Sequence, residues 1–249
     1  MPEGDTIRRL ADRITARFVG QRCTRCVTRD PRLVGLDLTG DVLREADAVG
    51  KHLFLRFEAD DGRRRSVHAH LLMDGRFVVG PASTEHEWRR RLELWFDDGR
   101  LTGLDVPLLG VVPTDREHEL TDHLGPDLCG PRAPDPVMVA ARLQRDPDLP
   151  LAAALLDQRN AAGFGNVYAV ELPFVVGVSP NQPVGAIVGL DGLLAIEGEE
   201  AHGDEARHHG PGDLAGGIRS RNVQYHARLP TSAERVPEGH GQTRGGGGW

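Results

Sequence analysis

The chain has 249 residues, of which 39% are hydrophobic and 27% charged, which suffices for one large domain or two smaller domains with cores of their own. It contains no apolar run that could form a transmembrane helix and no signal segment, and its three cysteines do not make a disulfide framework, so we expect a cytoplasmic protein. The formal net charge of −7 argues mildly against a nucleic-acid-binding protein, although a groove can be basic on an acidic protein.

An amphipathic helix is expected over residues 5–20. Its apolar residues recur with helical spacing on one face, and they are Ile7, Leu10, Ala11, Ile14 and Phe18. Asp5 or Thr6 can cap the start of this helix, and Gly20 can end it. The sequence "MPEG" that precedes it is therefore attached to an anchored helix.

Short alternating runs of apolar and polar residues follow from Cys23 to about Val112. Asp-Gly pairs at 61–62, 74–75 and 98–99 separate these runs and are typical of hairpin turns. The pattern predicts an antiparallel β-sandwich or barrel, so that residues 1–113 form an N-terminal domain with a leading helix.

Helical patterns return from about residue 114, separated by Pro and Gly. We therefore expect an α+β protein whose second domain, residues 114–196, is helical. The last 53 residues, 197–249, contain 12 Gly and only 12 hydrophobic residues. Such a composition buries too little apolar surface to offset the entropy of ordering, so a largely disordered tail is expected.

The amino terminus carries groups suited to covalent catalysis. Removal of Met1 before a small residue gives Pro2 a free secondary amine, and an α-amine with a pKa of about 7.7–8.0 is partly neutral near pH 7. Such an amine can form a Schiff base with an aldehyde-like carbon, while Glu3 transfers protons and Gly4 lets the backbone approach a substrate. The alternative is a tolerated terminal proline followed by a solvated charge at a helix start.

Lys51 is the single lysine among the 30 Lys and Arg residues of the chain. Chance in an arginine-rich sequence can explain it. Alternatively, position 51 requires a compact ammonium in place of a planar guanidinium.

The stretch "AGFGNVYAVE" at 162–171 places a Gly-x-Gly loop before a predicted helix. Free N–H groups at a helix start bind anions, so Gly163, Gly165 and Asn166 predict a site for a DNA phosphate. A dinucleotide-binding loop is excluded because residue 168 is Tyr and no strand precedes. A plain helix–helix turn capped by Asn166 is the alternative.

Two further stretches invite a metal hypothesis. In "HAHLLMDGRF", His68 and His70 share one face of a strand, but two histidines are too few for a metal site. A histidine that is hydrogen-bonded within the protein or one that faces a phosphate is the better interpretation. Met73, beside the Asp-Gly turn, is either a core residue or an apolar wedge that fills the space left by an extruded base. The "CTRC" stretch has no second cysteine pair, so no metal is expected there.

Together and in this order, several stretches resemble the formamidopyrimidine-DNA glycosylase/endonuclease VIII family of DNA repair enzymes. They are "MPEG", "VGKHLFLRF" around Lys51, "HLLM" at 70–73, "HLGPD" at 123–127 and "LLDQRNAAGFGNVYAVELPFVVGVSPNQPVG" at 155–185. The last resembles the helix–two-turn–helix DNA-binding element of that family. The resemblance covers roughly residues 1–196, and "MPEGDT" is most similar to the endonuclease VIII side.

The resemblance implies a bifunctional glycosylase and abasic-site lyase that acts, as a monomer, on damaged DNA. Pro2 is then the nucleophile that attacks C1′, and Glu3 transfers protons. Lys51, which meets phosphate beside the lesion, is the third residue of the implied catalytic set. The remaining implied contacts are His70 and Asn166 with backbone phosphates, and Met73 in the void left by the flipped base.

The C-terminus departs from the family pattern, which is a four-cysteine zinc finger or a metal-free hairpin that presents an arginine to phosphate. No cysteine follows residue 196, so we expect no zinc, and the candidate arginines stand in no recognisable context; they are Arg219, Arg221, Arg228 and Arg244. The alternative function is therefore a catalytically impaired protein that binds damaged DNA on the same scaffold.

Overall fold

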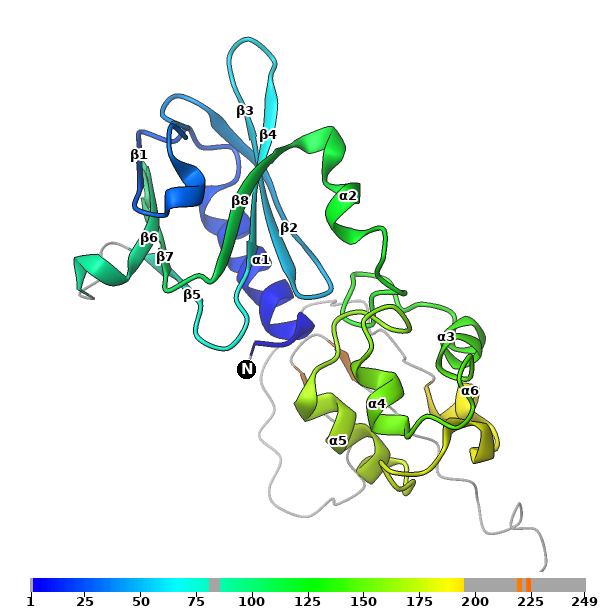
Figure 1. Cartoon of the computed structure of the whole chain (residues 1–249). Helices are drawn as coiled ribbons and strands as arrows, with labels where there is room; N and C mark the ends of the chain where they lie inside the picture. Colours follow the sequence, from blue (N-terminus) through cyan, green and yellow to red (C-terminus); the bar gives the residue numbers. More distant parts are fainter. Residues whose placement is uncertain (1, 81–85, 195–218, 221–222, 225–249) are drawn as a thin grey trace, which may run out of the picture.

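The computed structural model describes residues 2–80, 86–194, 219–220 and 223–224 (Figure 1). The first helix, α1, spans Gly4–Phe18 and buries the predicted apolar face. It begins one residue earlier than expected, with Glu3 at the N-cap position, so Asp5 and Thr6 lie inside its first turn and do not cap it. Asp5 instead forms an ion pair with Arg9, 2.7 Å away.

Two four-stranded antiparallel sheets form the N-terminal half, which confirms the predicted sandwich. One sheet has the order β1-β6-β7-β5 and the other β2-β3-β4-β8. The strands are β1 (Arg25–Thr28), β2 (Val42–Val49), β3 (His52–Glu58), β4 (Arg64–His70), β5 (Arg76–Gly80), β6 (Arg90–Phe96), β7 (Gly99–Leu104) and β8 (Leu108–Pro113). The alternating apolar residues of the strands and the buried face of α1 form one continuous core.

The Asp-Gly pairs lie in turns, as the sequence predicts. Gly62 and Gly99 have φ values of 82° and 141°, in a region of backbone conformation that favours glycine. Gly62 connects β3 to β4, and Gly99 begins β7 directly after the β6–β7 turn. The third pair, Asp74-Gly75, lies in the loop between β4 and β5.

The following segment is helical and has a separate apolar core. Its helices are α2 (His118–Thr121), α3 (Pro136–Leu143), α4 (Leu151–Leu156), α5 (Asn166–Val175) and α6 (Leu190–Leu193). The α+β class is therefore confirmed. Among the helices of the described residues, none has the length and hydropathy needed to cross a membrane.

Within residues 197–249 the structure describes only β9 (Arg219–Ser220) and β10 (Val223–Gln224), which pair antiparallel. The expectation of a disordered tail otherwise concerns residues outside the described part of the chain.

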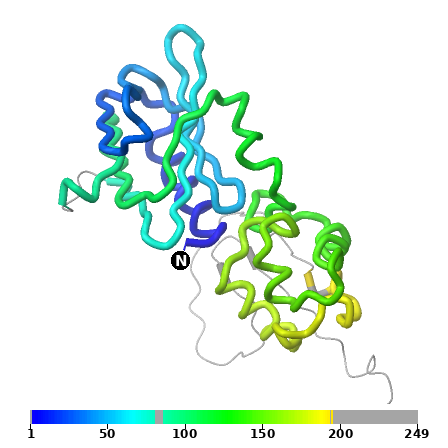
Figure 2. Tube along the Cα trace, in the orientation of Figure 1, coloured from blue at the N-terminus to red at the C-terminus, as the bar shows by residue number. Residues whose placement is uncertain are grey.

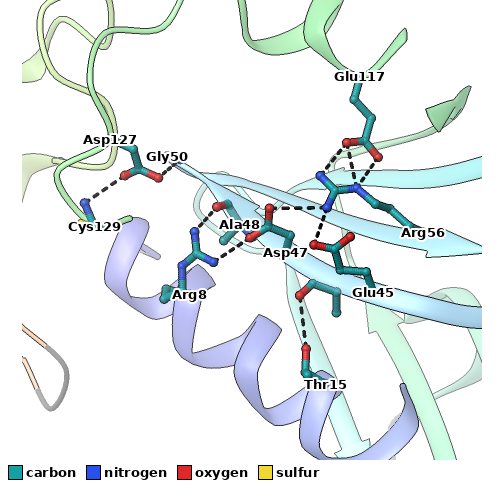
Figure 3. Close-up of polar contacts among 11 residues, drawn as sticks. Arg8, Thr15, Glu45, Asp47, Ala48, Gly50, Arg56, Glu117, Asp127 and Cys129 are labelled. Carbon is teal, nitrogen blue, oxygen red and sulfur yellow. Dashed lines mark hydrogen bonds and ion pairs between the residues drawn. The ribbon is translucent and has the colours of Figure 1, made fainter. Parts of the chain in front are cut away.

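The two cores meet at the N-terminus of the chain, which Figures 1 and 2 place between the sandwich and the helices. The β2–β3 turn reaches the same junction, because a Cβ on Gly50 would lie 3.2 Å from the Cβ of Ala162. Farther out, Arg56 on β3 donates hydrogen bonds of 3.0 and 2.7 Å to Glu117, directly before α2 (Figure 3). These contacts hold the second sheet of the sandwich against the helical segment.

Candidate active site

The amino-terminal residues are enclosed by the helical half of the molecule. The Gly4 N–H donates a hydrogen bond of 2.8 Å to the Gly163 carbonyl. A Cβ on Gly4 would lie 2.7 Å from the Gly163 Cα and 2.9 Å from the Cys129 Sγ. Gly4 is therefore required by this packing, and the space expected to admit a substrate is filled by the protein itself.

Glu3 is a carboxylate with only 3% of its surface exposed. Its oxygens accept hydrogen bonds from the Gly165 N–H at 3.0 Å and the Val167 N–H at 2.8 Å. These donors belong to the first turn of α5, where the helix dipole favours negative charge. The side chain of the residue that directly follows Pro2 is thereby held in one orientation.

Lys51 lies in the β2–β3 turn and points to the same place. A Cβ on Gly165 would lie 2.7 Å from the Glu3 Oε1 and 3.0 Å from the Lys51 Nζ. The glycine of "GFG" thus leaves room for an acid and an ammonium to converge. Burial lowers the pKa of Lys51, and the nearby Glu3 charge opposes that change.

Asp127 bonds to Gly50, the residue before Lys51 in the β2–β3 turn, and to Cys129 (Figure 3). Its Oδ2 accepts a hydrogen bond of 2.8 Å from the Gly50 N–H, and its Oδ1 accepts one of 2.9 Å from the Cys129 N–H. Burial raises the pKa of Asp127, while these two hydrogen bonds oppose the rise. Sequence reasoning quoted "HLGPD" only as part of the resemblance and missed this role.

His70 lies at the end of β4, where the strand pairing places it opposite His52. His52 also stacks on His68, with ring centroids 5.0 Å apart and a 2.8 Å contact between Nδ1 and Nε2, and His123 lies 6.5 Å from His52. Burial lowers the pKa of His52 to about 3 and of His68 to about 4, and also lowers that of His70. Sequence reasoning missed His52 and His123, although the hairpin register could have revealed His52.

Met73 lies in the β4–β5 loop with 65% of its surface exposed, so it is not a core residue. The neighbouring Leu72 is 42% exposed and has a φ of 47°, which is uncommon for a residue with a side chain. The loop therefore presents two apolar side chains to solvent.

Asn166 is exposed at the first position of α5. The free N–H groups predicted there as an anion site are partly occupied, because the Glu3 carboxylate takes those of Gly165 and Val167. The groups that remain available to an external phosphate are the Asn166 side chain and the outer edge of the first turn of α5.

Comparison with known proteins identifies the family. A model of the formamidopyrimidine-DNA glycosylase N-terminal domain matches residues 1–106. The chain is 44% identical over 191 residues to "Endonuclease 8 2" of Mycobacterium bovis, covering 75% of this chain and 72% of that protein. The chain belongs to the formamidopyrimidine-DNA glycosylase/endonuclease VIII family.

Two further similarities agree with this family. The chain is 42% identical over 187 residues to "DNA-(apurinic or apyrimidinic site) lyase Nei2" of Mycolicibacterium smegmatis, covering 75% of this chain and 71% of the relative. A solved complex of Lactococcus lactis Fpg with DNA containing an abasic site superposes with a TM-score of 0.64 at 24% identity, covering 78% and 73% of the two chains. The sequence similarity to two endonuclease VIII-type relatives confirms the prediction that the chain is most similar to the endonuclease VIII side of the family.

The zinc finger that this glycosylase/endonuclease VIII family implies does not fit the chain. Four cysteine ligands are needed, and the chain has three cysteines, all before residue 130; they are Cys23, Cys26 and Cys129. Within the described residues, no group of three or more His, Cys, Asp or Glu side chains could hold a metal ion. The four candidate finger arginines lie in the part of the chain whose side chains are not described.

Proposed function

We propose that Pro2, after removal of Met1, is the nucleophile with which this chain excises oxidised bases and cleaves the resulting abasic site. The chain is a DNA repair glycosylase and abasic-site lyase. The observation that carries the assignment of Pro2 is the buried Glu3 carboxylate, which follows it directly and converges with Lys51. A protein that only binds DNA needs no enclosed acid beside its terminal amine, so the alternative of a purely binding protein has no support.

The reaction follows from these groups. The lone pair of the Pro2 nitrogen attacks C1′, the bond from C1′ to the base breaks, and the base leaves with that electron pair and a proton. The nitrogen then loses its proton, the C1′–O4′ bond opens, and O4′ takes a proton, which yields a ring-opened iminium. Glu3 is the group positioned to give and take these protons.

Strand cleavage uses the same iminium. It acidifies the C2′ hydrogens, so that loss of one proton expels the 3′ phosphate by β-elimination. Hydrolysis of the iminium then releases Pro2 and the cleaved strand. The nucleotide has to be extruded from the duplex for its C1′ to reach the half-buried Pro2.

Four residues bind the DNA in this proposal. Lys51, His70 and Asn166 contact phosphates, and the contact of the charged Lys51 contributes about 1.5–3 kcal/mol. Met73 fills the space left by the extruded nucleotide, which its exposure in the β4–β5 loop permits.

The proposal also covers the organisation of the chain. Residues 1–113 form the catalytic domain, residues 114–196 the helix–two-turn–helix DNA-binding domain, and residues 197–249 replace the zinc finger without a metal. The enzyme works as a monomer without a cofactor. A cytoplasmic location agrees with three free cysteines among the described residues.

Borohydride trapping tests the nucleophile. The protein is made with a cleavable N-terminal tag, so that tagged and cleaved samples from one preparation differ only in whether the Pro2 nitrogen is free. Only the cleaved sample should form a covalent adduct with abasic-site DNA, and peptide mapping should locate it at Pro2. An equal yield of adduct from tagged protein contradicts the assignment.

A further inference from the structure

A cavity of about 840 Å³ lies on the sandwich directly beside the Met73 loop. Its lining includes Asp30, Arg32, Asp74, Trp88, Arg91 and Pro107. Asp74 follows Met73 in the chain, and Pro107 precedes Leu108, the residue that pairs with His70 across β4 and β8. The cavity therefore adjoins the surface that the proposed function assigns to DNA.

Three exposed apolar side chains lie within two residues of Asp74 or Pro107, which line the cavity. Leu72, Met73 and Leu108 have 42, 65 and 46% of their surface exposed. Asp74 lines the cavity and directly follows Met73, so the cavity begins one residue from the side chain that is proposed to fill the space of the extruded nucleotide.

Trp88 provides an aromatic surface in this cavity. It belongs to the short helix η2 (Glu87–Arg89), and 69% of its surface is exposed. The Arg89 guanidinium lies 6.0 Å from the centroid of the ring. Exposed aromatic rings with neighbouring arginines stack nucleic-acid bases, because every base offers a π-face.

The charges of the cavity suit a nucleotide. Arg32 is paired with Asp30 and Arg89 with Asp105, both at 2.6 Å. Arg91 forms no ion pair within the part of the chain that the structure describes, and its charge is among those that lower the pKa of Asp30 in the same cavity. Its guanidinium can therefore also meet a phosphate. At the rim, the exposed Asp74 can accept a hydrogen bond from an amino group of a base.

We propose that this cavity binds the base of a nucleotide that neighbours the extruded one in the DNA. The base stacks on Trp88, and the phosphate of this neighbouring nucleotide lies at Arg91. The inference rests on the proposed function for the position of the DNA. It adds a second nucleotide-binding site, on the sandwich, to the site around Pro2 and Glu3.

The test asks whether the contribution of Trp88 to DNA binding depends on the presence of one particular base. Binding is measured by fluorescence anisotropy with DNA that carries a non-cleavable abasic analogue at the lesion, and the neighbouring bases are removed one at a time. Trp88→Ala should weaken binding of the intact DNA by about 5- to 150-fold, and Trp88→Phe should restore most of the loss. With one particular base removed, wild type and Trp88→Ala should bind equally.

A control separates the site from a general loss of apolar surface. Val34→Ala removes an apolar side chain that is 85% exposed on the sandwich, outside the cavity lining, and should leave affinity unchanged. Wild-type affinity of Trp88→Ala, or a loss that is the same for every DNA of the series, overturns the inference. The yield of borohydride adduct at saturating protein should be the same for Trp88→Ala and wild type. Absence of adduct in both speaks against Pro2 and leaves the binding series interpretable.

Discussion

The Glu3 carboxylate accepts a hydrogen bond of 2.8 Å from the backbone N–H of Val167, a residue 164 positions further along the chain. One side chain thereby adjoins the proposed nucleophile and also satisfies the first turn of α5. The arrangement ties the chemistry at the amino terminus to the fold of the helical half, so changes at Glu3 affect both.

Glu3→Gln should lower the rate of base excision by about 10²- to 10⁴-fold, because the amide cannot transfer protons. It should also destabilise the protein by about 0.5–2 kcal/mol, because the amide N–H₂ opposes a backbone donor of α5. Single-turnover kinetics and thermal unfolding measure the two effects. Asp5→Asn, which removes the acid paired with Arg9, is the control and should keep the excision rate.

Lys51→Ala should weaken DNA binding by about 10- to 150-fold, the loss of one charged contact with phosphate. The slope of log K against log salt should flatten by about one contact. Lys51→Arg should keep that slope, and Arg63→Ala, in the exposed β3–β4 turn, should have little effect on either quantity. Wild-type affinity and slope in Lys51→Ala would mean that the single lysine has no role in binding.

Asp127→Asn should displace the turn that carries Lys51, because its amide cannot accept from both Gly50 and Cys129. An unsatisfied donor costs about 1–3 kcal/mol, which thermal unfolding detects. The DNA concentration that gives the half-maximal rate should rise by a larger factor than the factor by which the maximal rate falls. Asp122→Asn, an exposed acid nearby, is the control. A fall confined to the maximal rate would argue against a positioning role.

At pH values below about 6.5, the free energy of unfolding should decrease as the pH falls, and His52 and His68 are the cause. Burial lowers their pKa values to about 3 and 4 from 6.5, so between those limits the unfolded chain binds more protons than the folded one. Each group then contributes a slope of up to about 1.4 kcal/mol per pH unit, with stability lost as pH falls. Urea unfolding from pH 7 to 5 should show a smaller loss for His52→Phe than for wild type. An equal loss in both proteins contradicts the role of His52.

Truncation after residue 196 should change little on single-stranded or bubble substrates, since the tail lacks the cysteines of a finger. Activity on duplex lesions should already be low in the full-length chain, because bending a duplex costs several kcal/mol, on the order of 1–6, and needs compensating contacts. Parallel assays of both proteins on both substrates decide this. A large duplex activity lost on truncation would show that residues 197–249 act as a metal-free finger.

The sequence alone determined those features that depend on short-range periodicity and turn chemistry. The apolar face of α1, the hairpins at Asp-Gly pairs and the alternation of the strands predicted the sandwich, because side-chain direction repeats with the backbone. Local spacing also placed His68 and His70 on one face of β4. The motifs around Pro2, Lys51 and Asn166 pointed to the family through their order in the chain.

Only the tertiary structure decided which groups meet. It directs Glu3 into the start of α5, brings Asp127 to the Lys51 turn, and gathers His70 and His123 around His52. It also fills the space beside Gly4 with Gly163 and Cys129. These contacts join residues far apart in sequence, and the packing of two separate cores sets their geometry. A pattern in one short segment specifies the direction of a side chain but not the partner that folding brings to it.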